Sequence, residues 1–189
     1  MSSPSQDTRM STYTYNVAGL PVHVHYPPSL VSSATFSTGA PVFTAGKPIS
    51  VLIFLHGRLS RSGHKMMVDT ARDAFQFAED KKQAGQEQRE FIVVTFDHRN
   101  HGERTVDPFC NEGWTKDPEN EKHNERHAID MYGLQTGTAR DVSFVIDFLP
   151  AYLFPNDERT VAEWVVSGIS LGGHSTWLVL AHGTSLLLP

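Results

Sequence analysis

Residues 165–174 read VVSGISLGGH, and this stretch decides the fold. Ser170 stands between Gly168 and Gly172, with an apolar run on each side of the motif. A serine in this pattern occupies a sharp, strained turn from a strand into a helix, and neighbours without a Cβ let the chain pack closely around it. At the helix N-terminus, free N–H groups favour a developing oxyanion, so the motif predicts that Ser170 is a nucleophile.

Upstream and downstream of the motif, apolar patterns predict alternating strands and helices. Continuous apolar runs of this kind are typical of parallel strands that are buried on both faces. The predicted strands are Val51–Leu55, Phe91–Phe96 and Trp164–Ser167. The predicted helices are Lys65–Ala84, a helix capped by Thr138 with Asp141 three residues on, and Leu171–Ala181 closed by Gly183. This order predicts an α/β fold with right-handed parallel crossovers.

The N-terminal part has a different pattern. Residues 1–11 are polar and are predicted to form a disordered tail, and the ordered domain is predicted to span 12–189. Alternation from Tyr13 to Tyr26 around Gly19 predicts an antiparallel β-hairpin. Its two histidines, His23 and His25, share one face and are expected to face solvent. The stretch Ser32–Lys47 is expected to be irregular.

Three ordered motifs carry a family resemblance. His56-Gly57-Arg58 follows one predicted strand, Asp97-His-Arg-Asn-His-Gly102 follows the next, and the Ser170 motif follows the third. Over residues ~12 to 183 the chain thereby resembles the α/β-hydrolase superfamily. The resemblance implies an α/β-hydrolase fold that begins with the hairpin and lacks the later strands. It also implies that the backbone amides of Arg58 and Leu171 form the oxyanion hole.

The chain departs from the family pattern after Ser170. The family order is serine, then Asp or Glu, then His, but no acidic residue follows Ser170 and only His174 and His182 do. Both histidines fall on the predicted helix of the motif, where neither ring is expected to reach the nucleophile. A fragment, a truncated product and a chain completed by another polypeptide are all compatible with this sequence. Within this chain alone, the last strand is expected to have an unpaired edge.

Two functions are therefore considered. The first is acyl hydrolysis of a small ester or amide substrate, with the long segment Gly102–Gln135 near the pocket mouth; its Phe109, Trp114 and Tyr132 favour an apolar group. The second is an inactive product or interaction module that self-associates through the strand edge. A phosphate-binding loop is less consistent with the motif, because such a loop needs lysine after its glycine and His174 stands there.

The composition limits the remaining classes of protein. A net charge of −5, without a basic stripe, argues against nucleic-acid and anionic-membrane partners. A single cysteine, Cys110, and the lack of an apolar leader favour a cytoplasmic protein. His123 and His127 have helical spacing, but no nearby cluster completes a metal site. No cofactor or metal is expected.

Overall fold

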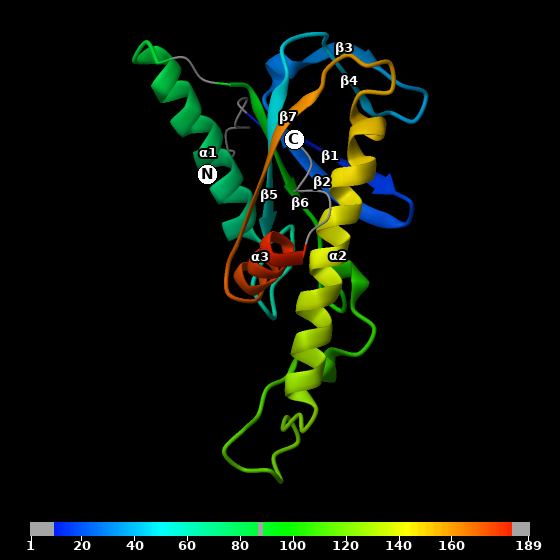
Figure 1. Ribbon diagram of the computed structural model, residues 1–189, viewed down its shortest axis with the longest axis vertical. Helices are drawn as coiled ribbons and strands as arrows, with labels where there is room; N and C mark the ends of the chain where they lie inside the picture. The colour runs from blue at the N-terminus through cyan, green and yellow to red at the C-terminus, as the bar shows by residue number, and fades with distance from the viewer. Residues whose placement is uncertain (1–9, 87–88, 183–189) are drawn as a thin grey trace, which may run out of the picture.

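A computed structural model describes residues 10–86 and 89–182 of the 189-residue chain (Figure 1). Its centre is a five-stranded sheet in the order β1-β2-β6-β5-β7. These strands are β1 (Ser11–Val17), β2 (Leu20–Tyr26), β6 (Phe91–Thr95), β5 (Ile49–Leu55) and β7 (Val161–Gly168). The helices are α1 (Lys65–Gln83), α2 (His127–Leu153) and α3 (Leu171–His182). Short 3-10 turns are η1 (Pro28–Leu30), η2 (Gly102–Arg104) and η3 (Pro108–Asn111).

The sheet combines antiparallel and parallel pairing as the sequence predicts. β1 and β2 form the N-terminal hairpin, and β2 pairs antiparallel with β6. β5 pairs parallel with β6 on one side and with β7 on the other. Since the three parallel strands run in the same direction, the loops that follow them meet at one end of the sheet.

Helices cover both faces of the sheet, and each face has its own apolar core (Figure 1). Met67, Ala71 and Phe75 of α1 pack on one face against Phe54 and Val93. On the other face, the apolar side chains of α2 and α3 meet the opposite side chains of the same strands. That second core includes Val51, Ile53, Leu55, Val142, Val145, Ile146, Leu149 and Val179.

Two predictions of local structure are wrong. The segment expected to be irregular, Ser32–Lys47, contains a two-stranded antiparallel ribbon of β3 (Val31–Thr35) and β4 (Pro41–Phe43). In addition, α2 begins at His127 and not near Thr138, so the long loop before it is shorter than expected. Gly183 and most of the predicted N-terminal tail lie outside the described residues.

The prediction for His25 is also wrong. This side chain is buried, and its ring nitrogens contact the hydroxyls of Thr12 at 2.8 Å and Thr95 at 3.1 Å. β2 is paired by β1 and β6 on both sides, so threonines of the neighbouring strands enclose the ring. Burial lowers the pKa of His25 to about 4.

No helix in residues 10–86 and 89–182 has both the length and the apolarity needed to cross a membrane.

Candidate active site

Ser170 lies at the junction between β7 and α3, at the end of the sheet where the parallel strands finish. Its backbone has φ of +51°, the left-handed conformation that side chains with a Cβ rarely adopt. Its side chain is exposed, and its hydroxyl has no hydrogen-bond partner within the described residues. The serine is therefore presented to solvent on a strained turn, as the sequence motif predicts.

Glycines allow the end of β5 to approach this turn. A Cβ on Gly172 would lie only 2.4 Å from the carbonyl oxygen of Leu55, and a Cβ on Gly168 would lie 2.4 Å from the carbonyl carbon of Gly172. The amide of Ile169 donates a hydrogen bond to that same Leu55 oxygen at 3.0 Å. The glycine spacing of the motif thus reflects backbone contact between the end of β5 and the strand-to-helix turn at Ser170, which is called the elbow below.

The loop after β5 packs directly against the serine. A Cβ built on Gly57 would lie 3.7 Å from the Cβ of Ser170, which is ordinary van der Waals contact. Arg58 follows Gly57 in the chain, and Leu171 follows Ser170. In the described part of the chain, neither of their backbone amides donates a hydrogen bond. Two backbone N–H groups without a hydrogen-bond partner among the described residues therefore lie near the serine, one in the loop after β5 and one at the first residue of α3.

Buried histidines hold this loop to the one after β6, a feature that the sequence reasoning missed. The backbone amide of His98 donates to Nε2 of His56 at 3.1 Å, and Nε2 of His98 donates to the carbonyl oxygen of His56 at 2.7 Å. Nδ1 of His56 then donates to the carbonyl of Gly57 at 2.8 Å. The two rings meet edge to face with centroids 4.2 Å apart.

The contacts of His56 require a neutral ring. A protonated His56 would direct its Nε2–H at the amide N–H of His98, so two donors would face each other. Burial lowers the pKa of His56 to about 4 and that of His98 to about 3. The third ring, His101, lies 5.5 Å from His56 by centroid distance, and burial lowers its pKa as well.

The buried Asp97 carboxylate holds the loop after β6 in place through hydrogen bonds. Burial alone would raise its pKa, but hydrogen bonds from the amide and hydroxyl of Ser62 and from the amide of Glu103 outweigh burial and lower it. Gly102 takes φ of +53°, and a Cβ there would lie 2.0 Å from the carboxylate. The Asp-x-Arg-x-His-Gly pattern therefore forms a structural turn. The sequence analysis used this pattern only for the family resemblance and did not predict the turn.

The predicted capping pair lies inside α2 and has a different role. The Thr138 hydroxyl contacts Nδ1 of His98 at 2.8 Å. The Asp141 carboxylate accepts from Arg99 at 2.8 and 3.2 Å and from Arg104 at 2.9 Å. The prediction of an N-cap is wrong because both side chains bond to the loop after β6, about 40 residues away. α2 thereby fixes that loop next to the elbow.

The other residues predicted near the site lie on the segment before α2, on α2 and on α3. Phe109 and Trp114 are 41% and 61% exposed on the segment before α2, and Tyr132 lies on α2 in a groove facing α3. His174 is exposed, and His182 borders the same groove as Tyr132. Neither histidine contacts the Ser170 hydroxyl among the described residues, in line with the expectation from their helical positions.

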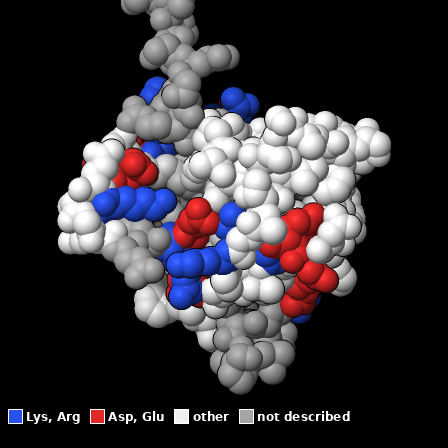
Figure 2. Space-filling model, turned by 90° about the horizontal axis from the view of Figure 1, so that it is seen from above, with Lys and Arg blue, Asp and Glu red and all other residues white. Residues whose placement is uncertain are grey.

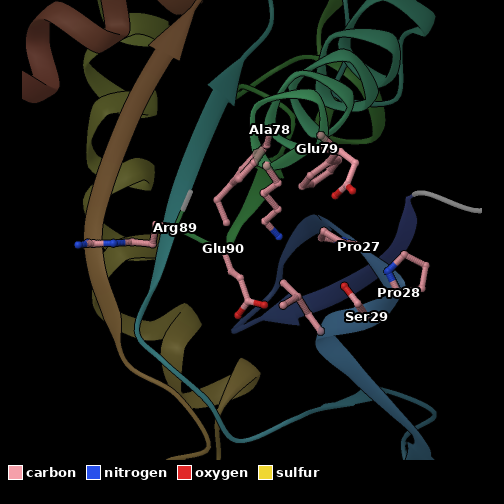
Figure 3. Close-up of a pocket in the computed structure, with 11 residues that line it drawn as sticks. Pro27, Pro28, Ser29, Ala78, Glu79, Arg89 and Glu90 are labelled. Carbon is pink, nitrogen blue, oxygen red and sulfur yellow. The ribbon is translucent and has the colours of Figure 1, made fainter. Parts of the chain in front are cut away.

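A cavity of about 390 Å³ lies at the end of the sheet opposite to the one that carries Ser170 (Figure 3). Pro27, Ala78 and Glu90 are among its lining residues. Glu90 precedes β6, whereas Ser170 follows the end of the parallel strand β7. This cavity is therefore separate from the candidate active site.

Neither a basic patch on the face in Figure 2 nor a metal-binding cluster in the described residues suggests a further site. Side chains of both signs lie next to one another on the end of the molecule seen in Figure 2, and they do not form a single basic patch on that face. Residues 10–86 and 89–182 contain no group of three His, Cys, Asp or Glu side chains that could hold a metal ion.

No protein-family model matches the chain, and no curated protein matches its sequence. Solved structures do match it. The structure of TT1662 from Thermus thermophilus superposes with a TM-score of 0.54 at 20% identity, over 93% of this chain and 52% of that one. A cold-adapted esterase from an Arctic intertidal metagenomic library matches with a TM-score of 0.48 at 16% identity, over 98% and 63% of the two chains. Siderophore hydrolase EstA from Aspergillus nidulans matches at 0.49 and 14%, over 98% and 59%.

The superposition on the Thermus thermophilus structure, together with the mixed sheet and its crossover helices, shows that the chain has the α/β-hydrolase fold. The predicted fold class is confirmed. The chain spans about half the length of the Thermus thermophilus structure that it matches.

Proposed function

We propose that the chain carries the nucleophile and oxyanion hole of a serine hydrolase that cleaves small esters or amides. The observation that carries the proposal is the left-handed backbone of Ser170 on a strand-to-helix turn packed against Gly57. Strain of this kind persists where surrounding structure maintains it, and it concentrates at functional sites.

The proposed mechanism uses three groups of this chain. In the complete hydrolase, the Ser170 hydroxyl attacks the acyl carbon, gives its proton to a base that none of the described residues supplies, and the carbonyl oxygen becomes an oxyanion. Collapse of this intermediate expels the alcohol or amine, and water then hydrolyses the acyl-serine. Without the base, solvent hydroxide attacks the acyl carbon in the same oxyanion site and expels the same leaving group. The amides of Arg58 and Leu171 donate to that oxyanion, which the N-terminus of α3 also stabilises. His56 and His98 position the Gly57 loop and take no part in proton transfer, because their ring nitrogens are occupied by backbone and Thr138 partners.

Activity is expected to be weak, because no base contacts Ser170 among the described residues. An oxyanion hole without a working triad still gives roughly 10³ to 10⁴ over water, whereas complete enzymes exceed ~10⁶. We predict that the purified chain hydrolyses p-nitrophenyl acetate faster than buffer does, but at least about a thousandfold more slowly than complete serine hydrolases.

The Ser170→Ala variant is expected to change this residual rate by less than about twofold, since solvent hydroxide can react in the same oxyanion site. Ser167→Ala, at an exposed serine of β7, is the matched control. Saturable hydrolysis that Ser170→Ala abolishes would reveal a base that this mechanism lacks. A rate equal to that of buffer would argue against the oxyanion hole.

A second candidate function is a non-catalytic interaction module, and we propose a cytoplasmic location in either case. The outer position of β7 in the sheet supports the interaction role. A strand edge without a partner can recruit another strand through backbone hydrogen bonds.

A further inference from the structure

The cavity of about 390 Å³ lies between η1 and the second half of α1, and it is called the η1–α1 cavity below. Figure 3 shows Pro27 and Pro28 on one side of this cavity and Ala78 on the other. Its lining residue Phe91 begins β6, and β5 lies between β6 and β7 in the sheet. The unpaired border of β7 therefore does not create this cavity.

Apolar side chains form the walls of the η1–α1 cavity. The rings of Phe75 and Phe91 stack with centroids 4.8 Å apart and planes inclined by 22°. Leu30 is buried beside them, and the rings of Pro27 and Pro28 add further flat surface. Few voids in proteins exceed one water molecule, whereas this cavity has room for roughly a dozen. Its size and walls fit a flat apolar ligand.

Two charged residues of the cavity already have partners elsewhere. Arg89 points away from the other labelled side chains in Figure 3, and its guanidinium lies 3.6 Å from the Glu163 carboxylate of β7. The Glu90 carboxylate accepts a hydrogen bond from the buried Arg159 guanidinium at 2.5 Å. These two side chains compensate other charges of the protein and are not available to balance the charge of a ligand.

Lys82 is different, because no hydrogen bond or ion pair engages its ammonium group among the described residues. The remaining carboxylate, Glu79, accepts from the Gln83 amide at 3.4 Å. An adjoining cavity shares Lys82 and adds further cations, so that four cations and two carboxylates line the two cavities together. This local excess of positive charge, in a chain of net charge −5, favours an anion.

We propose that the η1–α1 cavity binds an aromatic carboxylate of about the size of naphthoate. The aromatic ring packs against Phe75, Phe91 and the two prolines, and the carboxylate accepts a charge-assisted hydrogen bond from the Lys82 ammonium. The site lies at the other end of the sheet from Ser170, so the proposal does not depend on whether that serine is a nucleophile.

Titration calorimetry of the whole chain with 2-naphthoate tests the ligand class. One molecule is expected to bind per chain. The alcohol 2-naphthylmethanol, which has the same ring without the charge, should bind at least about tenfold more weakly, and the cation 2-naphthylmethylamine should bind more weakly still. Absence of saturable binding of 2-naphthoate up to about 1 mM would overturn the proposal. Tighter binding of the amine would also overturn it, because Glu79 and Glu90 would then decide the charge of the ligand.

Three variants test the location of the site. Lys82→Met keeps an unbranched apolar side chain and should weaken 2-naphthoate binding by at least about tenfold. Lys81→Met is the matched control, because that ammonium lies 5.2 Å from the centroid of the Phe77 ring and does not line the cavity. Ala78→Phe should fill the cavity and abolish binding, with circular dichroism as the check on its fold. Unchanged binding by Lys82→Met, or equal weakening by Lys81→Met, would contradict the assignment.

Discussion

The free energy of unfolding is expected to fall steeply between pH 6.5 and pH 5. His25, His56 and His98 are buried, and burial lowers each pKa to about 4, about 4 and about 3 respectively. In the unfolded chain a histidine binds its proton near pH 6.5. As pH falls below that value, the unfolded state gains protons that the folded state cannot accept, so the free energy of unfolding decreases.

The size of this effect follows from the number of histidines. Each contributes a slope of up to about 1.4 kcal/mol per pH unit between its unfolded and folded pKa. Three such groups together approach about 4 kcal/mol per unit, so about 6 kcal/mol is lost between pH 6.5 and pH 5, which is comparable with the lower end of the roughly 5 to 15 kcal/mol of a typical domain. Asp97, whose pKa is lowered, adds a further loss only at lower pH, where its carboxylate begins to bind protons.

Urea titrations at pH 7, 6 and 5.5 measure the slope. His25→Gln keeps a polar side chain and should reduce the slope by up to about 1.4 kcal/mol per pH unit. His23→Gln is the matched control, because that ring is two residues away on the same strand, only partly buried, and contacts Thr14 in the same way. Stability that stays constant from pH 7 to 5 would contradict the buried, neutral state of the histidines.

The second large effect is expected at the elbow glycine. Gly172→Ala should lower the free energy of unfolding by about 3 kcal/mol or more, because its Cβ would meet backbone atoms that cannot move aside without shifting β5. The nearest of these atoms is the Leu55 carbonyl oxygen at 2.4 Å. The displacement would also move the neighbouring Ser170.

Gly133→Ala is the control for this substitution. Gly133 lies within α2, and a Cβ there meets no atom within 4 Å. Alanine is a better helix former, so the variant should be stabilised by up to about 1 kcal/mol. Equal stability of Gly172→Ala and the wild type in denaturant titrations would mean that β5 does not approach the elbow so closely.

The fold was predictable because its main signals are local. Each of these elements can be predicted from about ten consecutive residues. They are the apolar runs of β5, β6 and β7 and the glycine turn around Ser170. The first part of α2 was missed because Gly133 and Gly137 weaken the helical pattern. Gly137 has a tertiary reason, since a Cβ there would lie 2.6 Å from the Arg99 side chain that reaches Asp141.

The surroundings of the site were less predictable. The hydroxyl of Thr138 looks like a helix cap in sequence, but its partner His98 precedes it by 40 residues. His25 looks exposed because the hairpin alone has a free face, and only the pairing of β2 with β6 buries it. Both errors share one cause, because the partners that decide these side chains are distant in the chain.

Covalent labelling tests the assignment of Ser170 most directly. The folded chain is incubated with a fluorophosphonate, digested, and mapped by mass spectrometry, with Ser170→Ala and urea-unfolded protein as controls. The adduct is expected on Ser170, forming slowly because no base assists, and absent from both controls. A folded sample that is labelled elsewhere while Ser170 stays unmodified would contradict the account.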